Sequence, residues 1–406
     1  MFEMRRRGLL AGTAALAALG GTAGQRARAA GRPVKIAVLN DMSGVYADYQ
    51  GQGSVIGTEL AVADAVAATG QRAEVIFGDH QNKPDIGANL ARRWLDTENV
   101  DMIIDVPNSA IALAVAELCR ERNKVFIGSG AGTSDLTGVR CSPNTVHWTY
   151  DTWSVGQSLG RAVTEAGSKR WFLLVADYAF GYDLEKNVTE AVLASGGTIA
   201  GVVRHPLGNS DYSSFLVRAG RDADVLGLCN AGGDNTTSIK QAAEFGLNRR
   251  MKIVGPVVNI NVIQGLGLRD AQGLLAATPF YWDHDDSSRE FSRRFQARHP
   301  RRIMPNDMQA GCYAATLHYL KAVAGGADPG DGRAVVSAMK ALPTDDPLFG
   351  RGTIRADGRK VHPLYIMETK GPQESRGEWD YFKQVSTVPP EQAYRPLNAG
   401  SCSLVR

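Results

Sequence analysis

The chain has 406 residues, of which 44% are hydrophobic and 21% charged, so two domains could each bury a core. This composition excludes a disordered chain, a collagen and a small disulfide scaffold. The formal net charge is +3, but residues 1–29 carry +4, which leaves −1 for the rest. A near-neutral chain lacks the basic surface that nucleic acids require, so we expect no nucleic-acid partner.

Residues 1–29 have the layout of an export signal. A basic end is followed by an apolar stretch that starts at Leu9, and by the small-residue site Ala27-Arg28-Ala29. The pair Arg6-Arg7 resembles a twin-arginine signal, and an ordinary secretion signal is the alternative. Either signal predicts cleavage near Ala29 and a periplasmic protein. The apolar stretch is not followed by a cysteine, so we expect no lipid anchor.

Five cysteines occur without CxxC spacing, which gives a zinc site no support. Cys119, Cys229 and Cys312 fall in apolar segments and are expected in the core. Cys141 and Cys402 lie in polar, loop-like surroundings, and an exported protein can form disulfides. We therefore predict a Cys141–Cys402 disulfide, and we expect no metal and no cofactor.

Short β-rich runs alternate with helical segments in the first part of the chain. The predicted strands are Val34–Leu39, Glu74–Phe77, Met102–Val106 and Val125–Ile127. The predicted helices are Gly53–Ala68, Pro84–Thr97 and Ser109–Arg122. This rhythm indicates a parallel sheet covered by helices on both faces.

The same alternation of short strands and helices is then repeated. The second set of predicted strands is Trp171–Ala176, Thr198–Arg204, Val225–Cys229 and Lys252–Val254. The helices between them are Tyr182–Ser195, Ser213–Gly220 and Thr237–Phe245. Two such blocks predict an α/β fold with two doubly wound, Rossmann-like lobes and a ligand cleft between them.

The last third of the chain is expected to complete both lobes rather than to form a third domain. Its predicted helices are Ser287–Arg298, Gln309–Ala324 and Arg333–Ala341, and its predicted strands are Gly352–Ile354 and Leu364–Glu368. The chain must then cross between the lobes more than once.

Enzyme signatures find no support in this sequence. The turn Asn40–Gly44 lacks the dinucleotide fingerprint, and no phosphate-binding loop motif occurs. Gly156–Gly160 matches GxSxG, but the helical period of the surrounding residues places Ser158 in mid-helix, whereas a nucleophilic serine needs a strand–helix turn. Asp283–Asp286 is typical of a solvated loop before a helix. We expect no enzyme; a secreted hydrolase that uses Ser158 is the alternative from another class.

Polar and aromatic residues follow the predicted strands of both lobes. Any one of these turns is typical of a loop or a helix cap, but five at the same sheet edges indicate a ligand crevice. The candidate binding residues are Ser43, Tyr46, Tyr49, Asn108, Ser109, Gly130, Ala131, Thr133, Tyr178, Phe180 and Asp234.

Four sequence strings stand out: Ile36-Ala37-Val38 with Met42-Ser43-Gly44, Gly128–Gly138, Tyr178–Gly181 and Gly232-Gly233. They resemble type I periplasmic solute-binding proteins, the Leu/Ile/Val-binding family that delivers ligand to ABC importers. The resemblance covers nearly the whole mature chain. It implies a small-molecule ligand, an ABC permease as partner and a monomer.

The same resemblance implies two lobes joined by three hinge crossovers. The first lobe would comprise residues 30–148 and 279–346, and the second residues 149–278 and 347–406. The strings Cys141–Asn144 and His147–Asp151 look like a branch of the family in which some members take aromatic acids.

Carried over residue by residue, the family's carboxylate-holding positions fall near Ser109 and on Gly130–Thr133, and Phe180 would pack on the ligand. The acid that holds an α-ammonium in the family would fall near Val257-Val258, and neither residue is acidic. Asp234 stands where amino-acid binders have an aromatic residue and is the one available substitute.

An aromatic or other non-amino carboxylate is therefore favoured over a leucine-like ligand, with an amino acid next. An ammonium without an acceptor in a closed cleft costs several kcal/mol, more than a ring gains by packing. A sensory module that reports ligand occupancy to a membrane receptor is the alternative within the same fold.

Overall fold

The computed structural model describes residues 32–219 and 222–405. The predicted export signal, residues 1–29, lies outside the described residues. The three sheets and all the contacts reported below belong to the compact unit Val34–Arg406. Among the described residues, no helix is long and apolar enough to cross a bilayer.

The first sheet is entirely parallel and has the strand order β2-β1-β3-β4-β5. Its strands are β1 (Val34–Asn40), β2 (Ala73–Asp79), β3 (Met102–Asp105), β4 (Val125–Gly128) and β5 (Thr145–His147). The connecting helices are α1 (Gly51–Thr69), α2 (Pro84–Thr97) and α3 (Ser109–Glu121). The central strands are apolar on both faces because helices cover both faces, which is the usual reason for continuous apolar runs.

The second sheet has the order β15-β14-β10-β9-β8-β6-β7. Its parallel strands are β6 (Arg170–Ala176), β7 (Thr198–His205), β8 (Val225–Cys229), β9 (Lys252–Val254) and β10 (Leu275–Thr278). The antiparallel strands β14 (Leu364–Thr369) and β15 (Phe382–Val388) extend one edge. The helices of this part are α4 (Thr152–Glu165), α5 (Ala179–Ala194), α6 (Ser213–Ala219), α7 (Gly233–Glu244), α8 (Ile260–Leu266) and α9 (Leu268–Ala271).

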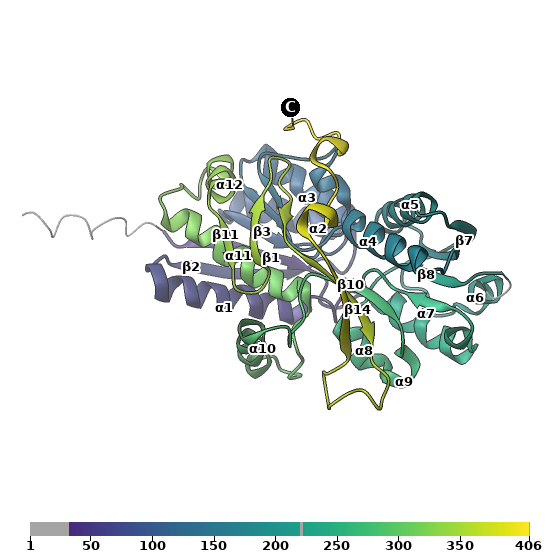
Figure 1. The fold of residues 1–406 in the computed structure, drawn as a ribbon. Coiled ribbons are helices and arrows are strands. Elements are labelled where there is room, and N and C mark those ends of the chain that lie inside the picture. The colour runs from purple at the N-terminus through teal and green to yellow at the C-terminus, as the bar shows by residue number, and fades with distance from the viewer. Residues whose placement is uncertain (1–31, 220–221, 406) are drawn as a thin grey trace, which may run out of the picture. The chain divides into compact units, whose positions relative to one another are not determined.

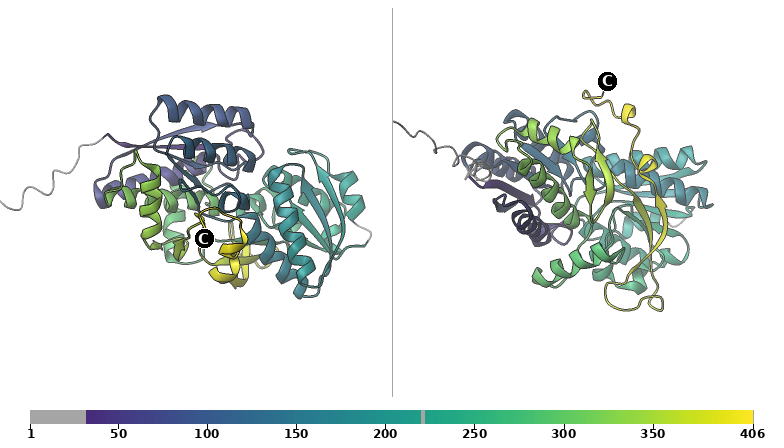
Figure 2. Two further views of the ribbon diagram at one scale, coloured as in Figure 1. Left: turned by 90° about the horizontal axis from the view of Figure 1, so that it is seen from above. Right: turned by 60° about the vertical axis from the view of Figure 1, so that its left-hand side comes forward.

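The chain passes between the two sheets three times. After β10 it returns to the first sheet as α10 (Asp286–Arg298), α11 (Asp307–Ala324) and α12 (Gly332–Ala341). It then forms the small sheet β11 (Thr344–Asp346), β12 (Gly350–Ile354) and β13 (Lys360–Val361), and ends in the second sheet with β14 and β15. Figure 1 shows the green helix α11 beside the purple helix α1, and Figure 2 shows this group apart from the teal helices of the second sheet.

The packing of α11 on α1 depends on glycine. A Cβ at Gly57 would lie 2.5 Å from the backbone carbonyl oxygen of Gln309, and one at Gly53 would lie 2.2 Å from the side-chain Nε2 atom of the same residue. Only glycine lets the two helices approach this closely, and α11 is thereby fixed to the first sheet.

Two buried cations connect the segments that cross between the sheets. The fully buried Arg359 donates hydrogen bonds to the carbonyl oxygens of Trp148 (3.0 Å) and Tyr150 (3.1 Å). Lys360 lies over the rings of Trp148 and Phe349 and pairs with Asp346 at 3.3 Å. Burial lowers the pKa of Lys360 to about 8 although Asp346 opposes this shift. These contacts join the end of β5 to the return of the chain near β13.

A disulfide joins Cys141 to Cys402, with a Cα–Cα separation of 5.6 Å. It links the C-terminal segment to the loop that precedes β5. Cys119, Cys229 and Cys312 are buried thiols.

The predicted fold class, two doubly wound Rossmann-like lobes, is confirmed. The predictions for α2, β8 and β9 agree with the observed bounds to the residue. By contrast, α5 begins three residues and α7 four residues before the predicted starts, and β5, β10 and β15 were not predicted. The early starts arise because Gly181 and Gly233, which read as turn residues, lie within the first turns of the helices.

Candidate ligand-binding site

A cavity lies where the carboxyl ends of the parallel strands of both sheets meet. It encloses only about 10 Å³, room for about one water molecule, so a ligand can enter it only when the surrounding rings move apart. Its described lining consists of Tyr46, Tyr49, Gln50, Pro107, Gly130, Tyr150, Tyr178, Phe180 and Ala231. Five of these nine side chains are aromatic and none is charged. We call this space the aromatic cavity.

The aromatic rings connect the two sheets directly. The hydroxyl groups of Tyr46 and Tyr178 are hydrogen-bonded to each other, and Tyr178 stacks on Phe180 with ring centroids 6.0 Å apart. Tyr49 donates a hydrogen bond to the carbonyl oxygen of Val257 at 2.7 Å. These tyrosines remain neutral because burial raises the pKa of each above its ordinary value.

Backbone contacts also hold the sheets together around the cavity. The amide of Gly233 donates to the carbonyl oxygen of Val45 at 2.9 Å. Gly232 has a φ of +64°, and a Cβ there would lie 2.3 Å from the same carbonyl oxygen. A Cβ at Gly132 would lie 2.7 Å from the Phe180 ring. Small residues are therefore required on both sides of the cleft.

Five of the eleven predicted binding residues line the aromatic cavity: Tyr46, Tyr49, Gly130, Tyr178 and Phe180. The other six lie outside its lining. Ala131 and Thr133 follow Gly130 on the same buried loop, where Thr133 caps a short 3-10 turn. Ser43 is exposed and donates a 2.6 Å hydrogen bond to Asp79.

Asn108 and Ser109 lie at the start of α3. The Asn108 side chain accepts hydrogen bonds from the amides of Ala110 (3.0 Å) and Ile111 (3.2 Å). Asparagine is a strong N-cap residue, and here its Oδ1 atom binds the first amides of the helix instead of a ligand. The Ser109 hydroxyl oxygen accepts from the Thr133 amide at 3.2 Å, which leaves its own proton free to donate.

Asp234 is buried close to the aromatic cavity, because its charge contributes to the raised pKa of both Tyr46 and Tyr178. Its carboxylate accepts from the Gly208 amide at 3.0 and 3.3 Å, and the residue is 1% exposed. Burial raises the pKa of Asp234, and a hydrogen bond from Tyr212 opposes that shift. The side chain we considered as an ammonium acceptor is thus already hydrogen-bonded by the protein and lies outside the cavity lining.

Other donors remain available at the cavity. Among the described residues, the backbone amides of Ala131 and Gly132 have no hydrogen-bond acceptor, although both residues are buried. Helices α5 and α7 begin beside the cavity after Tyr178 and Gly232, and neither residue caps its helix with a side chain. Unpaired amides and helix N-termini both favour an anionic group.

Four lining residues were not predicted: Gln50, Pro107, Tyr150 and Ala231. Pro107 is adjacent to Asn108, and Ala231 lies three residues before Asp234 on the turn after β8, so the same strand-end argument extends to both. Tyr150 follows the unpredicted strand β5, and its hydroxyl donates to the Gly130 carbonyl oxygen at 3.3 Å. The Gln50 Oε1 atom is buried without a partner in the described structure.

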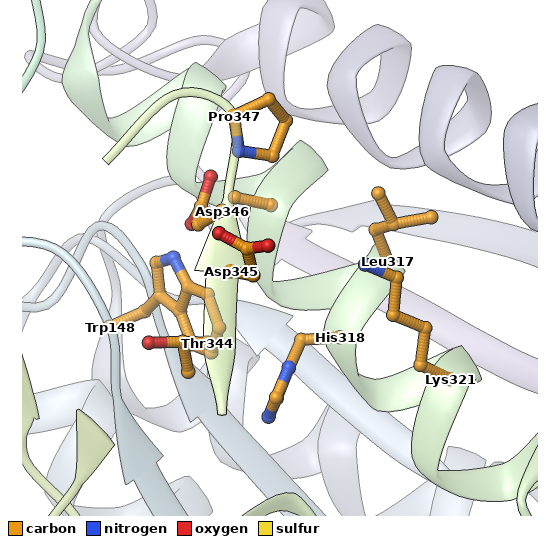
Figure 3. Close-up of a pocket in the computed structure, with 9 residues that line it drawn as sticks. Trp148, Leu317, His318, Lys321, Thr344, Asp345, Asp346 and Pro347 are labelled. Atoms are coloured by element: carbon orange, nitrogen blue, oxygen red, sulfur yellow. The ribbon is translucent and has the colours of Figure 1, made fainter. Parts of the chain in front are cut away.

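Two further cavities are less suited to a ligand that bridges the sheets. One is lined by residues 42–52 and 299–309, with none from the second sheet. The other lies at the crossing segments, where Trp148 and Thr344 face His318 and Lys321 of α11 (Figure 3). There Asp346 is paired with Lys360, and the His318 ring is hydrogen-bonded to the Met339 carbonyl oxygen at 2.9 Å.

Ser158 is not placed as a catalytic nucleophile, and the described residues show no metal-binding group. Ser158 lies in the middle of α4, as predicted, and not at a strand–helix turn. The described residues contain no group of three His, Cys, Asp or Glu side chains placed to hold a metal ion.

Two doubly wound sheets with a cavity between their carboxyl edges define a ligand-binding protein of the bilobal type. The chain belongs to the periplasmic binding protein family, because the sequence model of that family matches residues 33–377. It is a periplasmic binding protein of the branched-chain amino acid ABC transporter type. Members of this family bind solutes, and membership implies a periplasmic location.

Known proteins resemble the chain over most of its length. A Leu/Ile/Val-binding protein homologue from Brucella melitensis is 24% identical over 82% of this chain and 87% of its own. A periplasmic binding protein from Burkholderia mallei has 43% identity and a TM-score of 0.88, covering 92% of this chain and 99% of that one. An ABC transporter solute-binding protein from R. palustris, in complex with benzoate, has 21% identity and a TM-score of 0.79, covering 88% and 97%. This last likeness shows a shared fold.

Proposed function

We propose that this protein receives a small aromatic carboxylate for an ABC importer and closes its two lobes on it. The lobes would comprise residues 30–148 with 279–346 and residues 149–278 with 347–406. The observation that carries the proposal is the aromatic cavity itself, in which both sheets contribute rings and no charged side chain.

The carboxylate end of such a ligand has donors but needs no arginine. The free amides of Ala131 and Gly132 and the Ser109 hydroxyl proton lie on the loops where the family's carboxylate-holding positions fall. The uncapped N-termini of α5 and α7 add a favourable field. Hydrogen bonds from such donors to a charged acceptor are each worth about 1.5–3 kcal/mol.

The ring of the ligand would pack among Tyr46, Tyr178 and Phe180. Ring–ring geometry adds about 0.5–1.5 kcal/mol to the area buried by each aromatic pair. An α-ammonium, by contrast, would find no acid in this lining, and Asp234 is engaged with Gly208. The benzoate complex of the R. palustris protein supports the same ligand class, since that protein shares this fold.

Calorimetric titration of the mature protein with benzoate, cyclohexanecarboxylate and leucine tests the proposal. We expect benzoate to bind most tightly. Phe180→Leu should weaken benzoate binding by about 2- to 13-fold, the loss of one ring–ring contact. The control Phe215→Leu alters a ring that contacts His205 and Tyr212 instead, and should leave the affinity unchanged. Tight leucine binding without a benzoate response would overturn the proposal.

A further inference from the structure

A second, polar cavity adjoins the aromatic cavity. Its own volume is about 10 Å³, and Tyr150 lines both spaces, so they meet at this ring. Its polar lining residues are Asn259, Thr278 and Asp307. The Thr278 hydroxyl already has a hydrogen-bond partner nearby, because it donates to the Phe280 carbonyl oxygen at 2.8 Å.

Asp307 is a buried acid that lines this polar cavity. It is the first residue of α11 and is 5% exposed. Among the described residues its carboxylate forms no ion pair and no hydrogen bond to another side chain, and its charge is felt by Tyr49 and Tyr150. Burial raises the pKa of Asp307 to about 7, although the backbone amides of Asp307 and Met308 oppose the shift. A buried carboxylate of this kind is stabilised by any donor that a ligand supplies.

Asn259 lines the same cavity and has a side-chain N–H donor without an acceptor among the described residues. Its Oδ1 atom caps α8 by accepting from the amides of Asn261 (3.1 Å) and Val262 (3.4 Å). The residue is 6% exposed, and its Nδ2 group is buried without a partner in the described structure. A buried N–H donor without an acceptor costs free energy that a ligand oxygen would recover.

Asn306 fixes the relative position of these two groups. Its Nδ2 group donates to the Tyr49 carbonyl oxygen at 2.8 Å and to Asn261 Oδ1 at 2.8 Å. The start of α11, which packs on the first sheet, is thereby held against the start of α8, which follows β9 of the second sheet. Asp307 and Asn259 consequently face one space from two different lobes.

We propose that Asp307 and Asn259 form a subsite for a hydroxyl group on the ligand, which makes the preferred ligand a hydroxylated aromatic carboxylate. This inference rests on the proposed function. A hydroxyl group satisfies both side chains, because its O–H donates to the Asp307 carboxylate while its oxygen accepts from Asn259 Nδ2. An ammonium satisfies the acid alone, and an unsubstituted ring satisfies neither.

Calorimetry with benzoate and with 2-, 3- and 4-hydroxybenzoate tests the subsite in the mature protein. We expect at least one hydroxybenzoate to bind about 10- to 100-fold more tightly than benzoate, the contribution of a hydrogen bond to a charged group. Asp307→Leu should reduce this ratio to near one without weakening benzoate binding. Asn259→Ser keeps an oxygen that can cap α8 but removes the Nδ2 donor, and it should also lower the ratio.

Asp286→Asn is the matched control, because Asp286 is likewise the first residue of a long helix, α10, but lies outside both cavities. It should leave the ratio unchanged. Two results would overturn the subsite: a ratio near one in the wild-type protein, or a ratio that both Asp307→Leu and Asn259→Ser retain while circular dichroism shows normal folding. In either case, benzoate binding would still support the proposed function. Leucine binding with no response to any benzoate would instead overturn the proposed function.

Discussion

Gly132 limits how closely the two sides of the cleft approach each other. The distance of 2.7 Å from its virtual Cβ to the Phe180 ring is too short for any side chain. We expect Gly132→Ala to oppose closure at a cost of about 1–3 kcal/mol, and so to weaken ligand binding by about 5- to 150-fold. Calorimetry with benzoate measures this loss.

Gly265→Ala serves as the control for that substitution. Gly265 lies in α8, and a Cβ there meets nothing within 4 Å. Its affinity should equal that of the wild type. Unchanged binding in Gly132→Ala would show that Phe180 does not need to approach this loop.

Asp307 should make stability depend on pH in a specific direction. Its pKa is raised to about 7 in the folded protein from an ordinary value of 3.8. Between these values the folded state keeps a proton that the unfolded state has lost, so the free energy of unfolding falls as the pH rises from about 4 to 7. Asp307→Asn should therefore be more stable than the wild type at pH 8, by a few kcal/mol, and equal to it near pH 4.

Urea unfolding at both pH values provides the measurement. The neighbouring tyrosines Tyr49 and Tyr150 stay neutral in this range because burial raises the pKa of each. Asp105, whose pKa is also raised to about 7, is present in both proteins and cancels in the difference. An identical pH dependence of the two proteins would contradict the assignment.

Part of the cavity could be predicted residue by residue. Tyr178 and Phe180 follow β6 directly, and the carboxyl ends of parallel strands share one edge, so their position follows from the sequence pattern. Asn108 and Asp234 were predicted to contact ligand, but local hydrogen bonding engages both: Asn108 caps α3, and Asp234 binds the Gly208 amide. The Asn108 cap is a local contact of the kind that such turns commonly form, whereas the contact between Asp234 and Gly208 depends on tertiary structure that a sequence pattern does not reveal.

At the scale of elements, long helices and apolar strands were predictable, whereas short strands were not. Helix α2 has a proline at its start and an amphipathic pattern, and both bounds were correct. Strand β5 has three residues, and β10 reads Leu-Ala-Ala-Thr, which lacks β-branched residues except at its end. Pairing with neighbours, rather than local preference, makes these segments strands.

The Cys141–Cys402 disulfide ties the C-terminal segment across a sequence separation of 261 residues. A cross-link that closes a long loop restricts the unfolded chain, and its removal costs about 2–4 kcal/mol. We expect the double variant Cys141→Ser/Cys402→Ser to lose stability in this range, measured by urea unfolding, and to keep its ligand affinity. Equal stability of the variant and the oxidised wild type would show that the bond contributes nothing.

On the scale of the whole molecule, contacts between residues of the two lobes hold the cleft closed. The amide of Ser134 donates to Asp183 at 2.8 Å, and the Tyr46–Tyr178 and Val45–Gly233 contacts lie beside the cavity. If a ligand favours this arrangement, its addition shifts the population toward closed molecules. We expect the radius of gyration in small-angle scattering to decrease on adding saturating benzoate, and to decrease less in Gly132→Ala. An unchanged radius would contradict ligand-driven closure.

The central claim, that the cleft takes an aromatic carboxylate rather than a leucine-like amino acid, is tested most directly by ligand-dependent stability. A ligand at 100 times its Kd adds about 2.7 kcal/mol to the free energy of unfolding. Thermal unfolding of the mature protein should show this stabilisation with benzoate or a hydroxybenzoate, and none with leucine or valine. Stabilisation by leucine that Asp234→Ala abolishes, with no response to the benzoates, would contradict the claim.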